Sequence, residues 1–177
     1  GRKSSHLTVV YGLNTLHARR NLWRDLGNLS VGTPWILIID LNFVLSSQDR
    51  MNGNPVSNCE TQDFEAFFTN AALYEVPSSG CFFSWSNKGE GLNRIASRND
   101  RCLANCSWFF SNPLVKTMYF MPDISDHSPL VLDYLLVIIG GVRPFRFLNI
   151  IVDHPQFLEV IQSNWSNMNQ RTAGLSV

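Results

Sequence analysis

The chain has 177 residues, of which 45% are hydrophobic and 16% charged, and this composition indicates one packed globular domain rather than a disordered chain. Its 14 basic and 14 acidic residues give a formal net charge of zero, so any contact with phosphate groups must come from a local site. No apolar run reaches the roughly 20 residues of a membrane helix, and residues 1–6 hold no signal-peptide hydrophobic region, so we expect an intracellular protein that is not secreted.

The first part of the chain predicts alternating strands and helices. Residues 7–11 are β-branched and apolar, which is typical of a strand, and residues 12–15 predict a turn. Residues 16–26 carry apolar and basic side chains at helical spacing, and Gly27 stands where this helix would end. Residues 35–39 are a continuous apolar run, as in a strand that is covered on both faces.

The rest of this region predicts one further helix and then mainly strands. Residues 46–59 are polar and rich in Asn, which predicts a loop, and Thr61 could cap a helix that carries Phe64, Phe67 and Phe68. Further strands are predicted at residues 81–85, 94–103, 115–120 and 130–139, with a turn at residues 77–80. The alternation of helices and strands predicts an α/β layered fold.

The character of the sequence changes after Gly140-Gly141, where an aromatic and basic segment leads to an amphipathic pattern around Phe157 and Trp165. A segment this short cannot build its own core. We therefore expect a domain at residues 1–139, followed by a linker and an amphipathic helix at residues 140–177.

Large aromatic and basic side chains have two interpretations each. Trp35, Trp85 and Trp108 could stack on bases, but their strand-like surroundings favour core packing. Arg19 and Arg20 could bind phosphates, but a solvated helix face is the simpler expectation.

Two polar side chains, Asp40 and Asn42, follow the apolar run at residues 35–39. Side chains two positions apart in a strand project from one face, and α/β sheets commonly place ligands at the carboxyl ends of strands. The carboxylate could bind a metal or take a proton from water, and the amide could orient a phosphate. A turn that closes the strand is the alternative.

A second set of polar residues comes later in the chain. Asp126 and His127 are adjacent, and they could be a metal ligand beside an acid–base group or part of an ordinary turn. Asp100 could accept a hydrogen bond from the His127 ring and fix its tautomer. A salt bridge from Asp100 to Arg98, on the same face of the predicted strand, or to Arg101 is the alternative.

In order and spacing, these motifs resemble those of the endonuclease/exonuclease/phosphatase superfamily. The motifs are Tyr11 after a strand, WILIIDLN at residues 35–42, FSWSN at 83–87, RNDR at 98–101 and SDHSP at 125–129. Over about residues 7–136, the chain resembles the apurinic-type endonuclease domain of plant LINE-like non-LTR retrotransposons. Residues 143–155 resemble the segment that links such a domain to a reverse transcriptase.

The resemblance implies a four-layered α/β sandwich of the DNase I-like type, a divalent metal (usually Mg²⁺), and hydrolysis of a phosphodiester in DNA. It implies that Asp40 activates the attacking water, that Asn42 holds that water and the phosphate, and that His127, oriented by Asp100, contacts the phosphate. Phosphate-side residues would be Tyr11 and Asn14, and the acidic residue near the metal would be Asp126. A retroelement role further implies action in the nucleus.

Several positions depart from the family pattern. The family's first asparagine and its metal-binding glutamate have no counterpart before Tyr11, so we expect the N-terminal part of the domain to be missing and the Mg²⁺ site to be incomplete. Such a loss would expose an apolar sheet face through which the chain could associate. Asn99 stands where the family has an apolar residue on a buried strand. The alternatives to an endonuclease are a non-catalytic remnant or interaction module, and a phosphatase acting on a phosphorylated small molecule.

Overall fold

A computed structural model describes residues 4–29, 32–134, 157–159 and 161–162. The chain divides into two units, Gly1–Ile138 and Ile139–Val177. In the second unit, the described residues are helical and fall within the predicted amphipathic helix. The predicted linker and residues 135–139 of the predicted last strand lie outside the described residues. None of the helices in the described ranges is long and apolar enough to cross a membrane.

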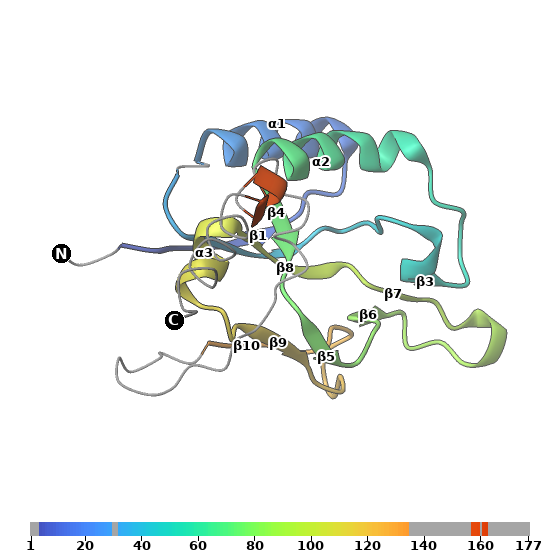
Figure 1. Cartoon of the computed structure of the whole chain (residues 1–177). Helices are drawn as coiled ribbons and strands as arrows, with labels where there is room; N and C mark the ends of the chain where they lie inside the picture. Colours follow the sequence, from blue (N-terminus) through green and yellow to red (C-terminus); the bar gives the residue numbers. More distant parts are fainter. Residues whose placement is uncertain (1–3, 30–31, 135–156, 160, 163–177) are drawn as a thin grey trace, which may run out of the picture. The chain divides into compact units, whose positions relative to one another are not determined.

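The largest sheet of the described residues contains β1 (His6–Tyr11), β2 (Trp35–Asp40), β8 (Asp100–Asn105) and β4 (Leu73–Glu75), in that spatial order (Figure 1). β1 and β2 are parallel, and the other two pairs are antiparallel. The strands predicted at residues 7–11 and 35–39 are therefore confirmed. Ile36, Leu37 and Ile39 of β2 are completely buried, as expected for a strand that is covered on both faces.

Two helices, α1 (Leu16–Leu29) and α2 (Asn58–Asn70), lie side by side over one face of this sheet (Figure 1). Their apolar side chains and those of the sheet form one core cluster, which includes Trp23, Leu26, Phe64, Phe67, Trp35, Leu37, Ile39 and Leu103. Burial of this apolar surface is the main stabilising contribution to the first unit.

The predicted helix boundaries need correction. α1 continues through Gly27 to Leu29, so Gly27 lies inside the last turn and does not end the helix. α2 begins at Asn58 with Ser57 at its N-cap, so Thr61 lies buried inside the helix and is not its cap.

Two smaller sheets complete the described part of the first unit. One contains β10 (Leu130–Asp133), β9 (Lys116–Tyr119) and β5 (Ser78–Gly80), and the other contains β3 (Arg50–Met51), β7 (Ala96–Ser97) and β6 (Trp85–Ser86). The predicted turn at residues 77–80 is wrong, because β5 pairs with β9 there. Gly80 has a φ of +90°, and a Cβ atom at this position would lie 2.1 Å from the Tyr119 carbonyl oxygen, so the pairing requires glycine.

The strand predicted at residues 94–103 is interrupted between β7 and β8. At the interruption, the Arg98 amide donates to the carbonyl oxygen of Asp49. Arg98 and Arg101 both bind Glu75. Arg101 follows Asp100 in β8 and so points to the opposite face. Arg98 lies outside β8 and shares Glu75 with Arg101, so it does not share a face with Asp100 as predicted.

Further corrections concern elements that the sequence pattern did not predict. The helix α3 (Cys106–Ser111) is capped by the Asn105 side chain, which accepts a hydrogen bond from the Trp108 amide. The short strand β4 was also missed. Of the strand predicted at residues 81–85, only Trp85 is in a strand, and the predicted loop at residues 46–59 contains a 3-10 helix, β3 and the start of α2.

The expectations for large aromatic and basic residues hold in part. Trp35 and Trp108 are buried as predicted, but Trp85 is partly exposed. Arg20 is exposed and bound to Asp63, whereas Arg19 is buried with its guanidinium 4.6 Å from the centre of the Phe43 ring. Burial lowers the pKa of Arg19.

One strand at an edge of the largest sheet carries an exposed apolar row. Alternate residues of β1, namely Leu7, Val9 and Tyr11, are 58%, 71% and 68% exposed. The sequence predicts an exposed apolar sheet face, whereas the exposed row is confined to β1, because the neighbouring β2 is buried on both faces. Association through that face stays a prediction.

Candidate active site

Three segments that are distant in sequence converge at one end of β2 and β8. Asp40 is the last residue of β2, Asp100 is the first residue of β8, and the two are paired directly across the antiparallel ladder. His127 Nδ1 lies 3.0 Å from Asp100 Oδ2. One possible ligand atom from each of the three side chains lies within 4.8 Å of the other two. We call Asp40, Asp100 and His127 the acidic–histidine cluster.

The loop after β2 holds the Asp40 carboxylate in place. The backbone amide of Asn42 donates to Asp40 Oδ1 at 2.9 Å, and Asn42 has a φ of +56°. This is the turn that the sequence offered as an alternative to a functional site, and the turn and the cluster coexist. Asn42 Nδ2 donates to the carbonyl oxygen of Gly12. Gly12 is required here, because a Cβ atom would lie 2.5 Å from the carbonyl oxygens of Asp40 and Leu41.

The backbone of Asp100 is held by two side chains that sequence reasoning did not identify. The Asp100 amide donates to Ser84 Oγ at 2.9 Å, and Tyr119 Oη donates to the Asp100 carbonyl oxygen at 3.0 Å. Both side chains are buried. They satisfy backbone groups at the point where β8 extends beyond β4, and so they fix the position of the carboxylate. Ser84 lies within the FSWSN motif, which was the available signal.

His127 has one ring nitrogen engaged and one free. A carboxylate only accepts hydrogen bonds, so in the contact between His127 and Asp100 the Nδ1 atom is the donor. This contact stabilises the tautomer with the proton on Nδ1. Among the described residues, Nε2 has no hydrogen-bond partner. The alternative, a salt bridge from Asp100 to Arg98 or Arg101, does not form, because both arginines bind Glu75.

Asp126 is exposed and lies outside the acidic–histidine cluster. Trp85 Nε1 donates to Asp126 Oδ2 at 2.9 Å, and the Ser86 amide donates to the Asp126 carbonyl oxygen. The hydrogen bond from Trp85 is the main reason that the pKa of Asp126 is held below its usual range. Trp85 also forms an isolated antiparallel bridge with His127, so β6 supports the Asp126-His127 segment.

The pKa of Asp40 is raised above its usual value. Burial of this half-buried carboxyl is the largest cause, and the nearby charges of Asp100 and Asp126 add to it. The amide of Asn42 and the His127 ring act in the opposite direction. A carboxylate with a raised proton affinity is a stronger general base at neutral pH.

Two predicted phosphate-side residues form no hydrogen bond to the cluster among the described residues. Tyr11 is opposite Asp40 in the register of β1 and β2, but its side chain is 68% exposed. Asn14 is exposed in the turn before α1. No hydrogen bond joins either side chain to the cluster within the described residues, and their roles stay predictions.

The donor atoms of the acidic–histidine cluster fit a divalent cation. Two carboxylates and an imidazole lie close enough to share one ion. Carboxylate oxygens suit Mg²⁺ and Mn²⁺, and an imidazole nitrogen is accepted more readily by Mn²⁺ or Zn²⁺ than by Mg²⁺. The cluster is thus a candidate metal site that does not single out Mg²⁺.

No protein-family model matches the chain, and no curated protein matches its sequence. A solved structure with partial similarity is the crystal structure of beta toxin 275-280 from Staphylococcus aureus, at 13% sequence identity and a TM-score of 0.42. The match covers 67% of this chain, and it spans 44% of the toxin chain. Function must therefore be inferred from the site itself.

Proposed function

We propose that the first unit is a metal-dependent phosphodiesterase domain that hydrolyses DNA. The observation that carries this proposal is the convergence of Asp40, Asp100 and His127 from three distant segments. The finer parts of the proposal follow from the sequence motifs: a four-layered sandwich of the DNase I-like type, an origin in a plant LINE-like retroelement, and action on nuclear DNA.

The side chains of the cluster have separate roles in this proposal. Asp40 accepts a proton from the attacking water, and its raised pKa suits that task. Asp100 holds the His127 ring through Nδ1, and in the protonated ring Nε2–H donates to a phosphate oxygen. Asn42 shapes the loop through its bond to the Gly12 carbonyl oxygen.

A divalent cation would be held by the carboxylates of Asp40 and Asp100. When bound, it supplies positive charge that stabilises the anionic phosphorus centre. Our proposal for the ion is Mg²⁺, with Mn²⁺ as the alternative, because carboxylate oxygens suit both ions.

The test is nicking of supercoiled plasmid by the full chain in Mg²⁺ or Mn²⁺, with EDTA as the metal-free reference. We expect nicking that Asp40→Asn reduces by about 10²–10⁴-fold, the usual contribution of a general base. Asp25→Asn, which changes an exposed carboxylate on α1, is the matched control and should leave the rate unchanged.

Two other results would each replace this proposal. Metal-dependent phosphate release from soluble phosphomonoesters without plasmid nicking would identify a phosphatase of small molecules. The absence of both activities, in a chain that folds, would identify a non-catalytic remnant of the same ancestry.

A further inference from the structure

The outer edge of β1 has no partner strand among the described residues. β1 pairs with β2 through its other edge only (Figure 1). The amides of His6 and of Gly12, just past the strand, donate to carbonyl oxygens on the β2 side. In a parallel pair, only alternate residues turn their backbone groups toward the partner strand. The amide and carbonyl groups of Leu7, Val9 and Tyr11 therefore point to the outer edge.

The three residues with outward backbone groups are also those of the exposed apolar row. The outer edge thus combines unpaired backbone groups with uncovered apolar side chains. The opposite face of β1 is anchored, because Thr8 Oγ1 accepts a hydrogen bond from Trp35 Nε1 and Val10 packs against the core cluster. The strand is held in an extended form that needs little further ordering in order to pair.

None of the features that normally protect a sheet edge occurs on β1. Natural proteins blunt such edges with charged side chains, with proline or with a bulge. Residues 4–14 contain no Lys, Arg, Asp, Glu or Pro. The pairing of β1 with β2 runs without a bulge over all six residues of the strand. An unprotected apolar edge of this kind is a template for another strand.

A second copy of the chain is complementary to this edge. The apolar row reads the same in both directions, with Val9 at its centre. If two β1 strands run antiparallel about a two-fold axis, Val9 lies opposite the partner's Val9, and Leu7 lies opposite the partner's Tyr11. Each pair can exchange backbone hydrogen bonds, and opposite side chains meet on one face. The formal net charge of zero adds no repulsion between the copies.

We propose that the chain forms a homodimer in which the β1 strands of two copies pair edge to edge and antiparallel, centred on Val9. The largest sheet then continues from one copy into the other. A single strand edge is a small interface, so the dimer forms at about micromolar concentrations or above and dissociates on dilution. The proposal is independent of catalysis, because neither substrate nor metal enters it.

The experiment measures the mass of the full chain by sedimentation equilibrium over a range of concentrations. We expect the average mass to rise from 20.1 kDa toward twice that value. Val9→Lys changes an exposed side chain and brings like charges together on the two-fold axis, so it should weaken dimerisation by at least about 10-fold. Val131→Lys, which adds the same charge to an exposed residue of β10, is the matched control and should dimerise like the wild-type chain.

A mixture of two variants tests the register. Val9→Lys and Val9→Glu should each be monomeric at concentrations where the wild-type chain is dimeric. Mixed in equal amounts, they bring opposite charges together on the axis and should associate again. A mixture that stays monomeric would contradict pairing centred on Val9.

Val9→Pro separates edge pairing from stacking of the apolar faces. Proline lacks the amide hydrogen that points to the outer edge, and it leaves the bonds of its neighbours to β2 in place. It should weaken dimerisation by about 10-fold or more, because two hydrogen bonds between the copies are lost. Dimerisation that Val9→Lys abolishes but Val9→Pro retains would assign the contact to the faces and overturn edge pairing. A wild-type chain that is monomeric throughout, or a Val9→Lys variant that dimerises normally, would also overturn the proposal.

Discussion

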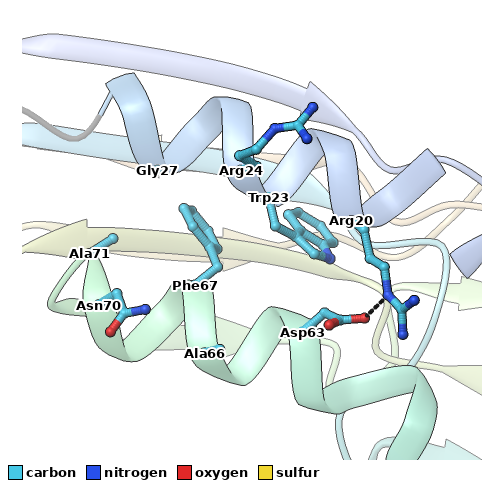
Figure 2. A pocket seen from close by; sticks show the side chains of 9 residues that line it. All are labelled: Arg20, Trp23, Arg24, Gly27, Asp63, Ala66, Phe67, Asn70 and Ala71. Carbon is cyan, nitrogen blue, oxygen red and sulfur yellow. Dashed lines mark hydrogen bonds and ion pairs between the residues drawn. The ribbon is translucent and has the colours of Figure 1, made fainter. Parts of the chain in front are cut away.

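The groove between α1 and α2 and the region around the acidic–histidine cluster differ in how completely their polar groups are satisfied. The groove is the larger hollow, about 550 Å³, and Figure 2 shows its lining. Its floor is formed by the rings of Trp23 and Phe67, stacked with centroids 5.7 Å apart. At its rim, Arg20 binds Asp63 at 2.7 Å. These side chains already have partners within the fold.

The cluster region has a smaller hollow, about 380 Å³, and two of its polar atoms, Asn99 Oδ1 and His127 Nε2, lack partners among the described residues. Asp40 is half-buried with a raised pKa, and Asn99 Oδ1 has no hydrogen bond. His127 has a free Nε2 among the described residues. Under the proposed function, the active site lies at the smaller of these two hollows. Polar groups held in place but left unsatisfied are then the better guide to it.

The largest expected effect compares one carboxylate from each region. Asp100 binds His127 and Asp63 binds Arg20, each through one side-chain contact. Asp100→Asn should lower plasmid nicking by about 10²–10⁴-fold, because a neutral amide neither fixes the tautomer nor stabilises the charged ring. Asp63→Asn should leave nicking within about 2-fold, because it breaks only an exposed pair. Equal losses in the two variants would remove the distinction between the regions.

The helix region should instead dominate stability. Phe64 is 1% exposed and contacts the rings of Trp23, Phe43 and Phe67. Phe64→Ala should lower the free energy of unfolding by about 3–5 kcal/mol, through lost burial and a residual cavity. Urea denaturation measures this change. The variant Phe110→Ala, which truncates an exposed ring, is the control and should change stability by less than about 0.5 kcal/mol.

A smaller effect is expected where the two smaller sheets support the site. Tyr119→Phe removes the hydroxyl that donates to the Asp100 carbonyl oxygen, and it should cost about 0.5–1.5 kcal/mol of stability. It should also lower nicking more than Trp35→Phe does. Trp35→Phe removes the comparable buried donor to Thr8 Oγ1, away from the cluster. An identical loss of rate in both variants would mean that Tyr119 contributes to stability alone.

The smallest expected effect is on stability as a function of pH. Because the folded-state pKa of Asp40 is raised, its contribution to stability is present below the unfolded pKa of about 3.9 and is lost as pH rises through the folded value. Asp40→Asn should therefore raise the free energy of unfolding at pH 7 by less than about 0.5 kcal/mol. The melting temperature should rise slightly with it. The difference should disappear in acid. Thermal melts of both proteins at the two pH values measure it, and a lower melting temperature at pH 7 would contradict the cause given for the pKa.

Sequence patterns predicted the elements that carry a local signature of residue type and spacing. The strands at residues 7–11, 35–39 and 115–120 follow from local runs of apolar residues, and α1 and α2 follow from their spacing. The short elements were missed because distant contacts create them. β5 depends on Gly80 fitting against Tyr119, and the break before β8 depends on the bond from Arg98 to Asp49.

By itself, the sequence determined the α/β character and the identity of Asp40, Asp100 and His127 as chemically interesting residues. Side-chain type and local spacing carry that information. Only the tertiary structure decided that the three side chains share one cluster, that Ser84, Tyr119 and Trp85 support it, and that Asn99 faces a pocket beside it. These relations join segments that are far apart in the chain, and they are fixed by strand register and packing, which no local pattern encodes.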